Sequence, residues 1–232
     1  MSKSVFDKIN KVMFISVHPD DETLGCGGAI LRHKTQGDSI YWLNLTGPSL
    51  DHPYGFTQER IKTREHQLKC VNAAYLFERY IDLAYPTQML ETIEPRLLIG
   101  SVSKVFQEIQ PNILYVPNRA DIHSDHKVGF QAIYAAAKNF RSPFIEKILM
   151  YETLSETEFA PSLTESVFMP NYYIDISEYM DKKIEIMQIY DTEIMPDPLP
   201  RSIHAIKGLG AFRGSRIGVK YAESFMMIFS KV

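Results

Sequence analysis

Cysteine is scarce in this chain: Cys26 and Cys70 are the only two among 232 residues, and no CxxC pair occurs. The composition therefore excludes a disulfide scaffold and a thiolate zinc site, and it fits the reducing cytoplasm. Long apolar runs are also missing, so no segment predicts a membrane span. Residues 1–8 hold no apolar stretch of the kind that a secretory signal needs. We expect a cytoplasmic protein with no membrane partner.

A strong excess of charge of either sign is absent as well. The chain carries 25 Lys and Arg against 28 Asp and Glu, a formal net charge of −3. This balance gives no reason to expect nucleic acid or an anionic membrane as the main partner. With 45% hydrophobic residues, a chain of this length can bury one full core. No repeat, low-complexity tract or linker divides the sequence, so residues 1–232 are expected to form one domain.

Short apolar runs alternate along the chain with segments of helical pattern. The expected strands are residues 12–17, 39–45, 79–83, 112–116, 146–151 and 171–176. The expected helices are residues 24–36, 57–76, 93–109, 126–139 and 177–191. This alternation predicts a single α/β domain of Rossmann-like type, with a mainly parallel sheet and helices on both faces. In such sheets ligands bind at the carboxyl ends of the strands, which the loop at 47–56 should overhang.

One histidine and three carboxylates, in the motif HPDDE at residues 18–22, follow the first expected strand directly. A structural interpretation is available, because proline ends a strand and Asp20 or Asp21 would cap the next helix. That interpretation leaves His18 unexplained. A His and an Asp three residues apart can turn toward one metal ion, and the intervening Asp20 is then free to handle a proton. Residues 24–30, rich in glycine, look like a turn entering the helix.

A second polar cluster, NRADIHSDH at residues 118–126, follows the apolar run at 112–117 and precedes a helical pattern at 128–137. His123 and His126 are three residues apart, so in a helical first turn they share a face. A single pair at this spacing is more often structural than metal-binding. Two such clusters, each at the carboxyl end of an expected strand, make coincidence a poor explanation. From spacing alone, His123 and His126 could both bind the metal, with Asp21 left as the base.

The pairing of these motifs resembles the PIG-L or LmbE-like family of zinc-dependent N-acetylglucosamine deacetylases. That family has an HPDDE-type motif after its first strand and an H-x-D-H motif after a later one, and both are intact at residues 18–22 and 123–126. Residues 173–179 are similar to the family's strand-to-helix junction, and residues 213–225 are similar to its C-terminal segment. The resemblance spans residues 11 to 229. The first two motifs carry its specificity.

The resemblance implies a metal-dependent hydrolase that removes an N-acetyl group from an N-acetylglucosamine-type sugar or glycoconjugate. It assigns His18, Asp21 and His126 as ligands of Zn²⁺, with Fe²⁺ as the alternative. Zinc with three protein ligands and an open position suits amide hydrolysis by activated water. The resemblance gives Asp20 the role of general base. The resemblance also ranks His123 as the cationic donor to the oxyanion and the leaving amine, and Asp125 is expected either to fix the tautomer of His123 or to orient a neighbouring group.

Four arginines are candidate substrate contacts. Arg60 and Arg64 begin the second helical pattern, where the family often has an arginine that contacts the sugar, and pairing on the helix surface explains them equally well. Arg213 and Arg216 lie in a stretch at 198–222 that carries five basic residues and no acid. This stretch is either a solvated loop or a mobile basic flap over an anionic part of the substrate. The expected partner is therefore a small N-acetyl amino sugar of anionic character, and assembly into a homo-oligomer is left open.

Two other classes of function are alternatives to a deacetylase. A nucleotide-binding α/β domain without hydrolysis would use the glycines at 25–28, but their spacing is not G-x-G-x-x-G and the acids before them would repel a pyrophosphate. A metal hydrolase acting on another bond, such as a phosphoester, would normally need a two-metal site with more carboxylate and histidine ligands. The number of bound metal ions separates this class from a deacetylase.

Overall fold

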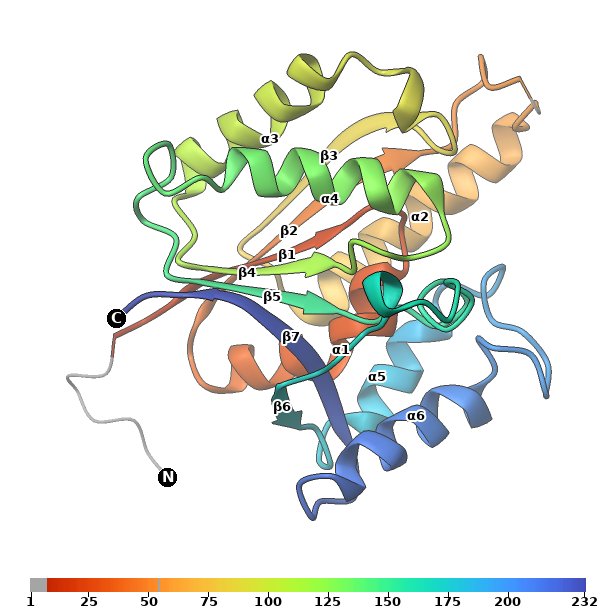
Figure 1. Cartoon of the computed structure of the whole chain (residues 1–232). Helices are drawn as coiled ribbons and strands as arrows, with labels where there is room; N and C mark the ends of the chain where they lie inside the picture. Colours follow the sequence, from red (N-terminus) through yellow and green to blue (C-terminus); the bar gives the residue numbers. More distant parts are fainter. Residues whose placement is uncertain (1–7, 54) are drawn as a thin grey trace.

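The computed structural model describes residues 8–53 and 55–232 (Figure 1). Residues 1–7, on which the prediction of no secretory signal rests, and Tyr54, in the predicted loop 47–56, lie outside the described residues. Within the described chain, strands alternate with helices and no helix is long and apolar enough to cross a membrane. The prediction of one α/β domain with a mainly parallel sheet is confirmed.

Seven strands of the described chain form one sheet in the order β3-β2-β1-β4-β5-β7-β6. They are β1 (Lys11–Ser16), β2 (Ser39–Gly47), β3 (Arg79–Pro86), β4 (Ile113–Pro117), β5 (Lys147–Tyr151), β6 (Tyr172–Asp175) and β7 (Ala222–Ser230). Strands β1 to β5 pair in parallel, and β7 is antiparallel to both β5 and β6. The strand order reverses between β1 and β4. A crevice is expected at this point, beyond the carboxyl ends of the two strands.

Helices cover both faces of the sheet (Figure 1). They are α1 (Asp21–Thr35), α2 (Gln58–Tyr75), α3 (Pro95–Ile109), α4 (Ser124–Ala136), α5 (Met180–Met187) and α6 (Ile203–Ser215), with short 3-10 turns η1 (Leu90–Thr92) and η2 (Thr164–Ser166). Residues of α1, α2, α5 and α6 pack in one buried cluster, and residues of α3 and α4 pack in another. Strand β1 separates the clusters, since Val12 and Phe14 join the first while Met13 and Ile15 join the second.

Helix α1 begins at Asp21, three residues before its predicted start, so the glycines at 25–28 lie inside a helix and form no turn. Close packing explains them. A Cβ atom on Gly25 would lie 2.3 Å from the Tyr151 ring, and one on Gly28 would lie 2.4 Å from Ile176. These glycines let α1 approach the sheet closely, which holds the HPDDE motif firmly at the end of β1.

The basic stretch at 198–222 is largely helical, which differs from the predicted loop or flap. Ser202 caps α6 by accepting a hydrogen bond from the backbone nitrogen of Ala205. The glycines that suggested a loop allow close contacts: a Cβ on Gly210 would lie 2.4 Å from Met180, and one on Gly214 would lie 2.6 Å from the carbonyl oxygen of Val219. Strand β7, which follows, was also not among the expected strands. It completes the sheet between β5 and β6.

Candidate active site and metal centre

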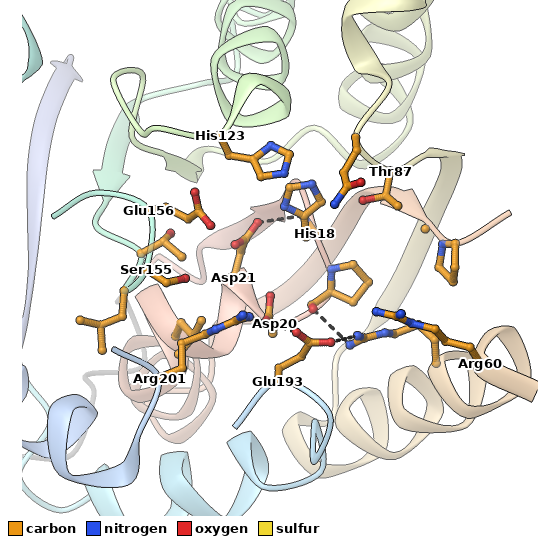
Figure 2. A pocket seen from close by; sticks show the side chains of 18 of the residues that line it. His18, Asp20, Asp21, Arg60, Thr87, His123, Ser155, Glu156, Glu193 and Arg201 are labelled. Atoms are coloured by element: carbon orange, nitrogen blue, oxygen red, sulfur yellow. Dashed lines mark hydrogen bonds and ion pairs between the residues drawn. The ribbon is translucent and has the colours of Figure 1, made fainter. Parts of the chain in front are cut away.

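A pocket with a cavity of about 240 Å³ lies at the carboxyl ends of β1 and β4 (Figure 2). Its walls come from parts of the chain that are distant in sequence: the HPDDE loop, the start of α2, the loop after β5, and the segment between α5 and α6. The switch in strand order therefore brings both predicted polar clusters to one place. Loop 47–56 contributes Gly47, Pro48 and Phe56 to the same pocket, as its position after β2 predicts.

The three residues that the resemblance assigns as metal ligands lie close together. One donor atom each from His18, Asp21 and His126 lies within 4.8 Å of the other two. Asp21 is held in place by two backbone nitrogens, since its Oδ2 accepts hydrogen bonds from Val17 at 3.0 Å and from His18 at 2.8 Å. Burial would raise the pKa of Asp21, but the neighbouring His126 and His18 lower it. The carboxylate is therefore ionised and oriented as a metal ligand needs to be.

His126 is fully buried, and its two ring nitrogens face different carboxylates. Nδ1 donates to Oδ2 of Asp121 at 2.8 Å. Nε2 lies 3.3 Å from Oδ2 of Asp21 and has no hydrogen-bond partner. The bond to Asp121 fixes the ring so that Nε2 points at the other two ligands. Asp121 is itself held by Asn118 and Thr157, which donate to its Oδ1.

These residues fit a divalent metal of the zinc type. A buried imidazole nitrogen without a hydrogen bond, next to an ionised carboxylate and a second imidazole, is the mixed donor set that zinc and ferrous iron accept. Burial would lower the pKa of His126, but Asp21 and Asp121 raise it well above its ordinary value. The protonated ring of His126 thus lies between the carboxylates of Asp21 and Asp121. A metal cation would displace the proton on Nε2 when it binds.

Asp20 stands beside this triad without belonging to it. Its backbone caps α1, but its side chain makes no capping hydrogen bond, so helix capping does not account for the carboxyl group. Oδ2 instead accepts from Nη1 of Arg201 at 3.1 Å, and Oδ1 has no partner among residues 8–53 and 55–232. Burial, and then the charge of Asp21, raise the pKa of Asp20 well above its usual range. A raised pKa and one free oxygen suit a general base.

His123 lies on the opposite side of His18 and Asp21 from Asp20 (Figure 2), with its ring centroid 4.4 Å from that of His18. Its Nδ1 accepts a hydrogen bond from the backbone nitrogen of Asp125 at 3.1 Å, so the ring hydrogen is on Nε2. Burial and the neighbouring His18 lower the pKa of His123 to about 4. The structure thus holds a neutral donor here, where the sequence suggests a cationic one.

Asp125 does not reach His123 with its side chain. Its Oδ2 instead accepts from Nε2 of His18 at 3.0 Å, and backbone nitrogens of Gln88 and Leu90 donate to the two carboxylate oxygens. Asp125 therefore orients the ring of His18, as Asp121 orients the ring of His126. Ligand atoms of His18, His123 and Asp125 form a second close group, but it shares His18 with the first.

The structure brings two of the four predicted substrate arginines to the pocket. Arg64 is mostly buried and pairs with Glu193, while Arg60 is exposed at the mouth, with its guanidinium 5.1 Å from the Phe56 ring centre. Arg213 lies outside the pocket and binds Glu152 through two hydrogen bonds of 2.8 and 2.6 Å. Arg216 is exposed at the end of α6 and does not line the pocket either.

Comparison with models of protein families shows to which family the chain belongs. The model of the PIG-L family, described as GlcNAc-PI de-N-acetylase, matches residues 13–137, which is more than half of the chain. This chain belongs to the PIG-L family. The matched range contains both polar clusters and all three residues of the metal triad. The resemblance seen in the sequence is confirmed.

Individual relatives extend the match to nearly the whole chain. Diacetylchitobiose deacetylase of Thermococcus kodakarensis is 24% identical over 238 residues, covering 96% of this chain and 85% of that protein. The Bacillus anthracis protein named "Probable N-acetyl-alpha-D-glucosaminyl L-malate deacetylase 2" is 24% identical over 193 residues, covering 78% and 80%. The crystal structure of a conserved protein from Thermus thermophilus superposes with a TM-score of 0.76 at 22% identity, covering 97% of both chains.

Four residues of the site were not assigned from the sequence: Asp121, Glu156, Glu193 and Arg201. Asp121 was within reach, because a metal-binding imidazole nearly always donates its other nitrogen to a carboxylate and Asp121 is five residues before His126. Arg201 lies in the basic stretch at 198–222, but the sequence of that stretch does not distinguish it from the other basic residues there. Glu156 and Glu193 reach the pocket through the fold alone.

Proposed function

We propose that this protein is a zinc-dependent hydrolase that removes an N-acetyl group from a small N-acetylglucosamine-type sugar or glycoconjugate, with ferrous iron as the alternative metal. The observation that carries the proposal is the triad of His18, Asp21 and His126, with a buried nitrogen of His126 unsatisfied and, beside it, one oxygen of Asp20 without a partner among the described residues. Membership of the PIG-L family supports the bond that is cleaved.

Zinc bound by this triad would polarise the acetyl carbonyl and make a water molecule easier to deprotonate. Asp20 then takes the proton as the water oxygen bonds to the carbonyl carbon. When the carbon–nitrogen bond breaks, the nitrogen takes its electron pair and the proton that Asp20 removed from water, while Nε2–H of His123 donates a hydrogen bond to the oxyanion. The products are acetate and a free amine. Asp121 and Asp125 keep their histidines in the required tautomers throughout.

Arg60 supports a sugar substrate of anionic character, whereas Arg64 is already paired with Glu193. Arg60 is the pocket arginine without an ion pair among the described residues, and it lies at the mouth, where the part of the substrate remote from the acetyl group would sit. An arginine binds carboxylate or phosphate through paired hydrogen bonds. The Bacillus anthracis relative is named for a malate conjugate, which is an acidic substrate. Residues Arg213 and Arg216 lack this support.

A cytoplasmic location belongs to the same proposal. Cys26 and Cys70 are both free thiols in the structure, as expected in a reducing compartment. Assembly into a homo-oligomer and the treatment of residues 1–232 as one deacetylase domain remain predictions.

The proposal is tested by measuring acetate release from a panel of N-acetylglucosamine derivatives, neutral and anionic, with the zinc-loaded protein. Release of acetate, fastest from the anionic members, is the expected result. A protein that binds one zinc per chain and releases acetate from no member would contradict the proposed reaction.

A further inference from the structure

The loop after β5, residues 153–158, is strained next to the metal triad. Ser155 has a backbone φ of 74°, which a residue with a side chain rarely adopts. Two backbone hydrogen bonds close the turn beneath it, from the nitrogens of Glu156 and Thr157 to the carbonyl oxygen of Thr153, at 3.1 and 2.9 Å. Backbone strain of this kind persists only where the surroundings enforce it, and it is concentrated at functional sites.

The same loop is attached through two adjacent residues, Glu156 and Thr157, to the segment that orients His126. Thr157 donates from its hydroxyl to Oδ1 of Asp121 at 2.7 Å. The backbone nitrogen of Ile122 donates to the carbonyl oxygen of Glu156 at 3.2 Å. The position of Glu156 is therefore fixed relative to the metal triad, even though the loop comes from a different part of the chain.

The three acids near this loop have different surroundings. Glu152 pairs with Arg213 and accepts from Ser224, and Glu158 is exposed and accepts from the backbone nitrogen of Ser155 at 2.7 Å. The carboxyl group of Glu156 has no hydrogen bond or ion pair among residues 8–53 and 55–232, although it is partly buried. Burial raises its pKa, and the charge of His126 opposes this rise. An acid half removed from water without a donor is costly.

Glu156 lines the same pocket as His18 and Asp21, and Figure 2 shows it on the side of Asp21 away from Arg60. We propose that Glu156 is a substrate-binding residue whose carboxylate accepts hydrogen bonds from the hydroxyl groups of the sugar ring next to the acetamido carbon. The proposal rests on the deacetylase function above and specifies how its pocket selects a sugar. Ring hydroxyls supply the donors that the carboxylate lacks, whereas a hydroxyl-free ring of the same size leaves it unsatisfied.

The test compares two ligands on the zinc-loaded protein by ligand-observed NMR titration: methyl N-acetyl-β-D-glucosaminide and N-cyclohexylacetamide, which has a six-membered ring without hydroxyls. Glu156→Ala should weaken binding of the sugar about 10- to 100-fold and change binding of the cyclohexyl compound less than about twofold. Glu156→Gln should fall between wild type and Glu156→Ala. Glu158→Gln is the matched control, because glutamine keeps an oxygen acceptor for Ser155, and it should bind both ligands as wild type does.

Three results would overturn the role of Glu156: unchanged sugar binding in Glu156→Ala, an equal loss for both ligands with zinc retained, or a wild-type protein that does not prefer the sugar. Acetate release is measured separately on the same samples. A wild-type protein that binds the sugar through Glu156 but releases no acetate would refute the proposed reaction and leave the binding role supported.

Discussion

The guanidinium of Arg201 lies 3.1 Å from the carboxylate of Asp20, although 181 residues separate them in the sequence. The same Nη1 atom is 3.1 Å from Glu193, and Glu193 in turn pairs with Arg64. A chain of alternating charges therefore links the start of α2, the segment before α6 and the loop before α1. Burial would lower the pKa of Arg201, but Asp20 and Glu193 raise it. We infer that Arg201 positions the candidate base.

Replacing Arg201 should damage catalysis and spare metal binding. In Arg201→Gln the carboxylate of Asp20 loses its charged partner, so kcat should fall about 10- to 100-fold while zinc content stays near that of wild type. Arg201→Lys should recover part of the loss, because a charge remains without the planar fork. Arg216→Gln, an exposed arginine of the same basic stretch, is the control. A kcat unchanged in Arg201→Gln would refute the positioning role.

Removing the charge of Asp121 should weaken zinc binding. Asp121→Asn leaves His126 without the carboxylate that fixes its tautomer, so the affinity for zinc should fall about 10- to 100-fold in a chelator competition titration. Asp181→Asn changes an exposed aspartate that pairs with Lys207, and it should leave the affinity unaltered. Equal zinc affinity in the two variants would show that Asp121 does not support the ligand.

The buried carboxyl group of Glu22 should make the stability of the protein depend on pH. It is fully buried, and burial raises its pKa to about 7 against 4.5 in the unfolded chain. Between these values the native state holds a proton that the unfolded state has lost, so wild-type stability falls as pH rises through this window. Glutamine does not titrate. The free energy of unfolding of Glu22→Gln relative to wild type should therefore rise by about 2 to 3 kcal/mol from pH 5 to pH 8.

Chemical denaturation at the two pH values measures this difference. Glu65→Gln, at an exposed site on α2, is the control and should show a far smaller change. The interpretation of Glu22 would be wrong if its variant and wild type kept a constant difference across this pH range.

Arg213 should act on stability and leave substrate binding alone. Its two hydrogen bonds to Glu152 are half-buried and hold α6 beside the end of β5. Arg213→Gln should lower the free energy of unfolding by about 1 to 2 kcal/mol, measured by denaturation. The KM for an anionic substrate should stay within about twofold of wild type. A raised KM with intact stability would restore the basic flap that the sequence suggests.

The sequence alone was sufficient to predict those strands and polar clusters that depend on the local pattern of residues. Strands β1 and β4 are almost fully buried runs, so their apolar stretches identify them, and the polar residues after them identify the site. Helix α6 could not be found in the same way, because its glycines serve contacts with Met180 and Val219 that only the fold creates. Local composition therefore suggested a loop.

The same limit applies to the site. The resemblance assigned His18, Asp21 and His126, which the structure brings together, whereas the contacts of Arg201 and Glu156 depend on loops brought together by the sheet. For Asp125 the sequence left two roles open, and only the geometry shows that its side chain contacts His18 while its backbone nitrogen contacts His123. Pairings between distant segments need the three-dimensional structure.

The most direct test of the mechanism measures bound zinc and acetate release together in wild type and in Asp20→Asn. Wild type should hold about one zinc per chain and release acetate, and Asp20→Asn should keep its zinc while kcat falls by about 100- to 10,000-fold. Acetate release at the wild-type rate in Asp20→Asn would contradict the assignment of the base. A wild-type protein that takes up no zinc would contradict the metal centre itself.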